Sequence, residues 1–283
     1  MSRFALGSVL TITLALAAAC GGSHSSGASA PTETPTPAVS ATTPPPTPTP
    51  VPTDSGPSVG SYVNSTCTTS VVRPLSIQLI TELDCIKPNA VEQIPADNQL
   101  DVGSIFNYLQ TKPGQSLPVV ANDRPAVTMH INSALRSLAQ QFLLYQWYAT
   151  GQCGISLAAT PGTSNHERGL AVDVQDTTGW RTPFQNHSWH WIGSSDPVHY
   201  DYVGTSGVVD IQGTSVMAFQ RLWNLNHPND TIAEDGAYGP NTELRLKKSP
   251  AQGFALGSTC GAQPFIGWNF DAPVDETPDT CAL

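Results

Sequence analysis

The sequence predicts an α+β fold, in which packed helices accompany a small antiparallel sheet and a small helical module follows near the C-terminus. Three observations support this prediction. Apolar residues recur at helical spacing in several stretches, shorter stretches alternate apolar and small or polar residues, and Gly or Pro residues separate these segments. Helices followed by short strands are typical of α+β domains.

The first 58 residues are predicted to lie outside the folded part. Residues 1–20 contain one Arg, an apolar run and small residues before Cys20, which is typical of a lipoprotein-type signal peptide. Leu16 lies one position earlier than in the usual lipoprotein signal, so cleavage and secretion without lipid stays open. Residues 21–58 are rich in Pro, Thr and Ser and predict an extended linker. We expect an exported protein, either anchored to the membrane through lipid at Cys20 and facing the periplasm or cell wall, or secreted.

Charge and cysteine content restrict the possible partners and predict disulfides. The net charge is -10 with only twelve Lys and Arg residues, which argues against a nucleic-acid partner. Six cysteines in an exported chain indicate disulfides, although spacing does not fix their connectivity. The shortest N-terminal pairing joins Cys67 with Cys85. The shortest C-terminal pairing joins Cys260 with Cys281 and leaves Cys153 unpaired.

The clearest helix is predicted over residues 132–150, "NSALRSLAQQFLLYQWYAT". Asn132 or Ser133 would cap its start, and Gly151 follows its end. Another helix is expected between residues 62 and 98, where Leu and Ile recur at helical spacing. These two helices would supply much of the core.

The stretch "PGTSNHERGLAVDV", residues 161–174, predicts a turn followed by a strand. His166 and Asp173 are seven residues apart, about 10.5 Å along a helix and more along a strand, so they can share a ligand only if the chain folds back. Gly169 permits such a reversal. After it, one strand face carries Leu170, Val172 and Val174. Asp173 then points to the other face, beside small residues.

The stretch "SSDPVHYDY" supplies a second group of polar residues. His199 and Asp201 have strand spacing and share a face, and Asp196 precedes His199 by three residues across a proline turn. His166, Asp173 and His199 together offer two imidazoles and one carboxylate. This is a ligand set of catalytic zinc sites, which leave a fourth position for water. Asp196 would lie beside that water.

Spacing alone leaves a plainer interpretation open. Most of the seven histidines of an exported protein are expected at the surface, and one His and Asp pair indicates little by itself. Asp196 could simply begin a turn. We interpret His187 and His190, in "QNHSWHW", as residues of an aromatic loop rather than ligands.

Three elements of the chain resemble one family. "SNHERGLAVD" resembles the signature Ser-x-His-x-x-Gly-x-Ala-x-Asp of the VanY-like peptidoglycan peptidases, which are zinc D-alanyl-D-alanine carboxypeptidases and L-alanyl-D-glutamate endopeptidases. "DPVH" resembles their second motif, an acid three residues before the last zinc histidine. "LRSLAQQ" is similar to their Arg-Ser-x-x-x-Gln element. The elements occur in the family's order and cover about residues 120–204.

The resemblance implies roles for individual residues. His166, Asp173 and His199 would bind Zn²⁺. Asp196 would act as the general base and pass a proton from water to the leaving amine. Arg136 would stabilise the developing oxyanion or hold the carboxylate of the substrate.

Further residues would support the substrate side or the outer layer of this site. They are Ser164, Gln141 and Asp201. Many family members have Glu at the position of Asp196, and the shorter acid occurs notably in phage-type endopeptidases. Asp in place of Glu preserves the role of the acid but leaves open which peptide bond is cleaved.

A second resemblance concerns the C-terminal part. After the peptidase domain, predicted over residues 59–204, residues 205–250 resemble a peptidoglycan-binding repeat of three short helices, one of them near residues 214–227. Its expected core positions are Val216, Phe219, Leu222, Leu244 and Leu246. The alternative is a helical extension of the peptidase domain. Residues 251–283 form a tail with two cysteines.

These features predict a zinc metallopeptidase that hydrolyses a peptide bond in the stem peptide of peptidoglycan, with Zn²⁺ as cofactor. We favour a D-Ala-D-Ala carboxypeptidase. The alternatives are an L-Ala-D-Glu-type endopeptidase and a non-catalytic lipoprotein that binds the cell wall. The complete ligand set with an acid nearby favours an enzyme, because a binding protein needs no base beside an open zinc position.

Overall fold

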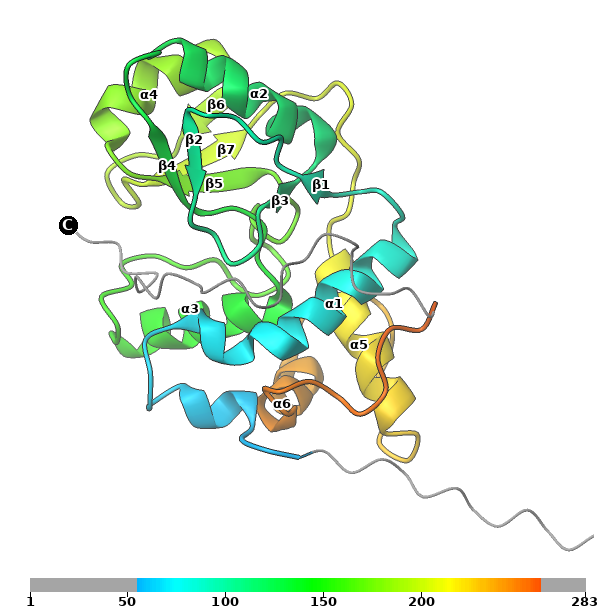
Figure 1. The fold of residues 1–283 in the computed structure, drawn as a ribbon. Coiled ribbons are helices and arrows are strands. Elements are labelled where there is room, and N and C mark those ends of the chain that lie inside the picture. The colour runs from blue at the N-terminus through cyan, green and yellow to red at the C-terminus, as the bar shows by residue number, and fades with distance from the viewer. Residues whose placement is uncertain (1–54, 261–283) are drawn as a thin grey trace, which may run out of the picture. The chain divides into compact units, whose positions relative to one another are not determined.

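The computed structural model describes residues 55–260, which form an α+β unit (Figure 1). The predicted fold class is confirmed. The predicted signal peptide, Cys20, nearly all of the linker and the tail from residue 261 lie outside the described residues. None of the helices in residues 55–260 is long and apolar enough to cross a bilayer.

Helices and short strands alternate along the chain. The helical elements are η1 (Val59–Tyr62), η2 (Thr69–Val72), α1 (Arg73–Ile86), α2 (Thr111–Asn122), α3 (Leu138–Thr150), α4 (Thr177–Asn186), α5 (Thr214–Asn226) and α6 (Pro240–Lys248). The strands are β1 (Glu92–Gln93), β2 (Leu100–Val102), β3 (Tyr108–Leu109), β4 (Met129–Ser133), β5 (Ala171–Val174), β6 (Trp189–Trp191) and β7 (His199–Tyr202).

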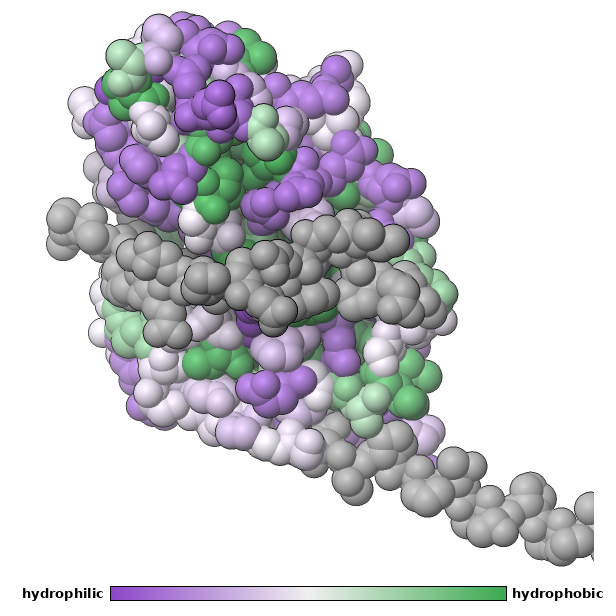
Figure 2. Space-filling view, viewed as in Figure 1, coloured by the Kyte–Doolittle hydropathy of each residue, from purple (hydrophilic) through white to green (hydrophobic). Residues whose placement is uncertain are grey.

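A five-stranded sheet forms the centre of one part of this unit. Its strand order is β2-β4-β5-β7-β6, and β4, β5, β7 and β6 pair antiparallel as predicted, whereas β2 joins β4 in parallel. One face packs against α2 and α4 through a cluster that includes Leu117, Trp180, Phe184, Val172 and Tyr200. The surface over this part is mostly hydrophilic on the side seen in Figure 2, as expected where polar helix faces meet solvent.

The predicted helices are present, but one begins later than expected. The helices predicted within residues 62–98 and near residues 214–227 are confirmed as α1 and α5. The helix predicted from residue 132 begins at Leu138, because Met129–Ser133 pairs as strand β4 between β2 and β5. Ser137 and Gln140 form a capping box at its start, and Gly151 ends it with a φ of 66°.

A second core joins the N-terminal and C-terminal helices. Buried residues from Val59 to Phe254 form one cluster, and α1, α3, α5 and α6 all contribute to it. Four of the predicted module core positions, Val216, Phe219, Leu222 and Leu246, are buried there, whereas Leu244 is 45% exposed. The cluster contains residues from both sides of the boundary predicted at residue 204. Independent folding of residues 205–250 stays a prediction.

The disulfides differ from the shortest pairings. Cys67 bonds Cys153, and Cys85 bonds Cys260. The expectation was wrong because packing, and not sequence distance, brings the cysteines together. The segment before α1 lies at the end of α3, where the indole N–H of Trp147 donates to Val63 O at 2.9 Å. Cys281 lies outside the described residues.

We expect Phe219→Ala to lower the free energy of unfolding of the whole unit by about 3–5 kcal/mol, because it removes a buried ring from the shared helical core. The measurement is denaturant unfolding followed by tryptophan fluorescence. Leu244→Ala is the control on the neighbouring helix, and it should change the free energy by no more than about 0.5 kcal/mol. A Phe219→Ala protein of unchanged stability would exclude α5 from the core.

Candidate metal centre

A tight turn positions the first histidine of the candidate site. The N–H of Gly169 donates to His166 O at 3.1 Å, and the N–H of Leu170 donates to Asn165 O at 2.9 Å. Gly169 has a φ of +62°, and a Cβ there would lie 3.0 Å from Gln110 N. The predicted reversal is therefore confirmed, and both its backbone angle and this close contact favour glycine at this position. Ser164 stabilises the turn by accepting the His166 N–H at 3.2 Å.

The register of the sheet positions the other two residues. Ser133 of β4 lies opposite Asp173 of β5, which lies opposite His199 of β7. Directly opposed residues in antiparallel strands point to the same face. Asp173 and His199 therefore lie side by side on the face that does not pack against α2 and α4.

Three side chains converge on one point. His166 Nε2 lies 3.2 Å from Asp173 Oδ1 and 3.1 Å from His199 Nδ1, and His199 Nδ1 lies 3.2 Å from Asp173 Oδ1. Atoms about 2.0–2.2 Å from one tetrahedral zinc ion would be separated by about 3.3–3.6 Å, slightly more than these three distances. The three ligand atoms thus match one face of a zinc tetrahedron, and this group could hold a metal ion.

Outer hydrogen bonds orient both imidazole rings. His166 Nδ1 lies 2.7 Å from Ala134 O, and His199 Nε2 lies 2.8 Å from Asp201 Oδ1. A carbonyl and a carboxylate accept only, so these ring nitrogens donate, and the opposite nitrogens direct their lone pairs to the common point. Asn165 Nδ2 in turn donates to Asp201 Oδ1 at 2.9 Å. Asp201, predicted as a supporting residue, thus lies behind His199.

The charges of the group favour a cation at its centre. Burial alone would raise the pKa of Asp173, but His166, His199 and Arg136 outweigh it and hold the pKa well below its ordinary value. Burial and the charge of Arg136 lower the pKa of His166. Burial also opposes charge on His199, yet its bonds to Asp173 and Asp201 raise its pKa to about 10. A ring between two carboxylates therefore strongly attracts positive charge.

Arg136 contacts the outer oxygen of Asp173. Its Nη2 donates to Asp173 Oδ2 at 2.9 Å and to Ser133 Oγ at 3.0 Å, and its Nη1 donates to Gln141 Oε1 at 3.1 Å. Gln141 is itself fixed by donating to Ala159 O at 2.8 Å. The guanidinium is therefore rigidly held at the edge of the group. Ser133, interpreted from the sequence as a helix cap, serves instead as one of its partners.

Asp196 lies at the turn that leads into β7. Its carbonyl accepts the N–H of His199 at 3.3 Å, and its side chain is half-buried. Burial, and next the negative charge of Asp173, raise its pKa to about 6, although His199 and Arg136 oppose this. A carboxyl group with a pKa near neutral pH suits proton transfer.

One buried acid was missed by the sequence analysis. Glu167 accepts hydrogen bonds from Gly162 N at 2.8 Å, from Ser164 N at 3.4 Å and from Ser215 Oγ of α5 at 2.8 Å. It is 2% exposed, and burial raises its pKa to about 7 although these bonds oppose the shift. Glu167 stands at a position of the signature where any residue is allowed, so the motif does not indicate a role for it. Its contact with Ser215 of α5 depends on the tertiary packing of α5 beside the turn.

The two histidines interpreted as loop residues lie outside the ligand group. His187 Nε2 pairs with Asp123 Oδ2 at 3.1 Å. His190 is exposed on the edge strand β6, opposite Asp201.

Comparison with known proteins supports the family resemblance. Residues 119–196 match the model of the VanY family, described as D-alanyl-D-alanine carboxypeptidase, which confirms the resemblance over this segment. The match includes Arg136, Gln141, Ser164, His166, Asp173 and Asp196 and ends three residues before His199. None of the curated proteins matches the chain. The predicted likeness of residues 205–250 to a wall-binding repeat stays a prediction.

We expect about one zinc ion per purified chain and loss of zinc in His166→Ala and in His199→Ala, because each change removes one of three protein ligands. Elemental analysis after dialysis measures this. His187→Ala is the matched control and should keep its zinc, because its partner Asp123 lies outside the group. Full zinc content in both ligand variants would refute the assignment.

We expect Glu167→Gln to flatten the pH dependence of stability. The pKa of Glu167 rises on folding from 4.5 to about 7, so its contribution to stability is complete below pH 4.5 and is lost as pH rises through about 7. The amide oxygen can still accept from Gly162 and Ser164, and its NH₂ can donate to Ser215. Urea unfolding from pH 4 to pH 8 should show a smaller loss of stability in the variant, by about 3 kcal/mol at most. Equal losses of unfolding free energy from pH 4 to pH 8 in the wild type and the variant would contradict this expectation.

Proposed function

We propose, starting from the VanY domain at residues 119–196, that the protein is a zinc-dependent carboxypeptidase that removes the terminal D-alanine from the stem peptide of peptidoglycan. One observation carries the proposal. The group of His166, Asp173 and His199 lies beside a half-buried acid, Asp196, whose pKa is raised to about 6. A site that only stored a metal would not need this acid.

The donor set fits zinc better than harder cations. Two imidazoles and one carboxylate suit zinc, whereas Mg²⁺ and Ca²⁺ favour oxygen ligands. A zinc ion bound there would polarise the scissile carbonyl and lower the pKa of the attacking water. Asp201, Ala134 and Asn165 keep the ligand atoms in place by the hydrogen bonds described above.

Asp196 would transfer the proton. In its ionised form it accepts the proton of the attacking water, and in its protonated form it delivers this proton to the nitrogen of the leaving D-alanine. A pKa of about 6 makes both forms accessible near neutral pH. Its half-buried position lets it contact substrate and still keeps this pKa raised.

Arg136 would bind an oxygen of the substrate. A guanidinium has five N–H donors, and the bonds to Asp173, Ser133 and Gln141 use three of them. The remaining donors suit either the terminal carboxylate of the substrate or the oxyanion that develops at the scissile carbonyl. Its fixed position favours precise orientation of either group.

An endopeptidase that cuts inside the stem peptide is the second candidate. Asp196 supports it, because the shorter acid resembles that of phage-type endopeptidases. Both activities require an exported protein that reaches the wall. We place it outside the cytoplasm, anchored through Cys20 or secreted, with residues 205–250 as a proposed contact to peptidoglycan. The two candidates differ in whether a free carboxyl terminus is needed.

We expect the zinc-loaded protein to release D-alanine from a stem pentapeptide with a free carboxylate and to be much slower on the same peptide with a terminal amide. Mass spectrometry of the products measures both rates. Asp196→Asn should lower the free-acid rate by roughly 10²-fold or more while zinc content stays normal.

Asp101→Asn is the control for this change, because Asp101 pairs with His130 on the exposed edge of the sheet. Equal rates on both peptides, with cleavage at an internal bond, would establish the endopeptidase instead. A fully active Asp196→Asn protein would show that another group transfers the proton.

A further inference from the structure

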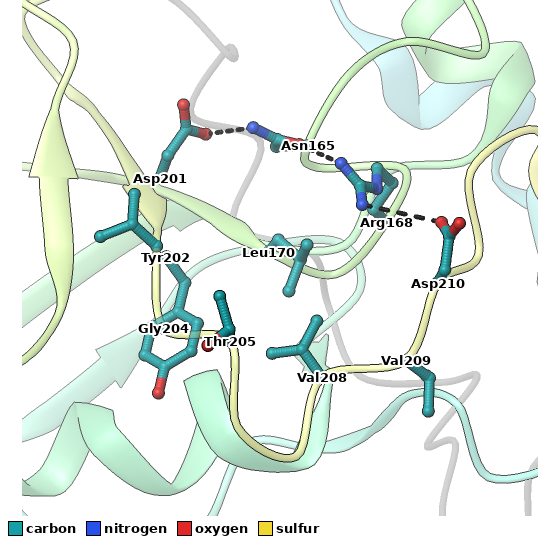
Figure 3. A pocket seen from close by; sticks show the side chains of 11 residues that line it. Asn165, Arg168, Leu170, Asp201, Tyr202, Gly204, Thr205, Val208, Val209 and Asp210 are labelled. Atoms are coloured by element: carbon teal, nitrogen blue, oxygen red, sulfur yellow. Dashed lines mark hydrogen bonds and ion pairs between the residues drawn. The ribbon is translucent and has the colours of Figure 1, made fainter.

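A pocket of about 380 Å³ lies next to the candidate metal centre and shares Asp201 with it (Figure 3). The oxygen of Asp201 that accepts from His199 Nε2 also accepts from Asn165 Nδ2. The pocket is thus separated from a metal-binding imidazole by a single hydrogen bond. It is formed by the turn that carries His166 and by residues 201–210, which follow His199.

The inner walls of this pocket are largely apolar. In Figure 3 the side chains of Leu170, Thr205 and Val208 point toward one another across it. Leu170 is 6% exposed and forms a fixed floor, whereas Val203, also part of the lining, is 57% exposed. Such walls suit an aliphatic chain that enters from solvent.

The rim of the pocket carries two opposite charges that are only loosely paired. Arg168 Nη2 lies 3.8 Å from Asp210 Oδ1, which is beyond hydrogen-bond distance. The side chain of Asp210 is 83% exposed, so its carboxylate can take another partner. Arg168 Nη1 donates to Asn165 Oδ1 at 3.2 Å, which holds the guanidinium at the rim. Its Nε is buried and has no hydrogen-bond partner within residues 55–260.

An aliphatic wall below a separated cation and anion is complementary to one kind of side chain. That side chain is a short alkyl chain whose last carbon bears both an ammonium and a carboxylate group. The carboxylate would pair with Arg168 and the ammonium with Asp210. A side chain with only one charge would pair with one of these two residues, and an uncharged one would pair with neither.

The position of the pocket fits the stem residue that precedes the two D-alanines. Asp201 follows His199 by two positions on β7, which is about 6.6 Å along a strand. This is comparable with the separation of two residues in an extended peptide, so a peptide held at the metal centre can place a neighbouring side chain there.

We propose that this pocket binds the third residue of the stem peptide and selects a side chain that ends in an ammonium and a carboxylate on one carbon, as in diaminopimelate. The proposal rests on the proposed function, because it assumes a stem peptide at the metal centre. It adds a specificity determinant formed by Arg168 and Asp210, neither of which belongs to the metal group or the acid.

The test uses four soluble pentapeptides that differ only at the third residue. They carry diaminopimelate, lysine, 2-aminopimelate or norleucine, so that the side chain ends in both charges, the ammonium, the carboxylate or neither. We expect the zinc-loaded wild type to cleave the diaminopimelate peptide with a kcat/KM roughly five- to tenfold above each singly charged peptide, mainly through KM. Norleucine should be the poorest.

Two variants assign the charges. Arg168→Gln should bring the ratio of kcat/KM for the diaminopimelate peptide to kcat/KM for the lysine peptide close to one. Asp210→Asn should bring the same ratio for the diaminopimelate and 2-aminopimelate peptides close to one. Arg124→Gln, which removes a cation paired with Asp176 elsewhere on the surface, should keep both ratios. Asp210 is exposed, so its variant remains informative if Arg168→Gln proves unstable. Equal kcat/KM for all four peptides, or equal losses on all four in both variants, would overturn the proposal.

A binding measurement separates this proposal from the proposed function. Calorimetric titration with tripeptides that end at diaminopimelate or at norleucine requires no hydrolysis. If the wild type cleaves none of the pentapeptides, the proposed carboxypeptidase fails, and a preference of roughly fivefold or more for the diaminopimelate tripeptide still supports the pocket. Equal affinities for the two tripeptides would reject the pocket in either case.

Discussion

The pairing of β5 with β7 is the constraint on which the rest of the site depends. It sets Asp173 directly opposite His199, and a shift of either strand by one residue would turn that strand's ligand residue to the other face, into the core with α2 and α4. The alternation that buries Val172 and Tyr200 in this core therefore also directs Asp173 and His199 to the opposite face of the sheet. The apolar core of the sheet thus keeps the polar site in register.

A turn, rather than strand pairing, positions His166 beside Asp173 and His199. The turn at Gly169 brings it back over the strand, and Ser164 and Ala134 fix its backbone and ring. Glu167 connects the same turn to Ser215 of α5, so the helical core supports the position of the ligand. The C-terminal helices therefore do more than extend the chain, because one of them contacts the turn that carries His166, a candidate metal ligand.

The electrostatics of the site follow from a few buried charges. Arg136 compensates one oxygen of Asp173 while the other oxygen faces the two imidazoles. Burial, and next the charge of Asp173, raise the pKa of Asp196. Asp201 orients His199 on one side and borders the adjacent pocket on the other. Each carboxylate thus has a distinct partner, which is how similar acids in one small site acquire different chemistry.

The sequence by itself determined the local features, which are the helices with strong apolar periodicity, the turn at Gly169 and the strand with Asp173. Its motifs also indicated His166, His199, Asp196 and Arg136 as candidate site residues. These depend on nearby residues or on patterns readable along the chain. Only the tertiary structure decided that Met129–Ser133 is a strand, that Cys67 bonds Cys153, that Glu167 is buried and that Arg168 and Asp210 border one pocket. Each of these depends on partners distant in sequence, and local propensity does not encode which distant segments pack together.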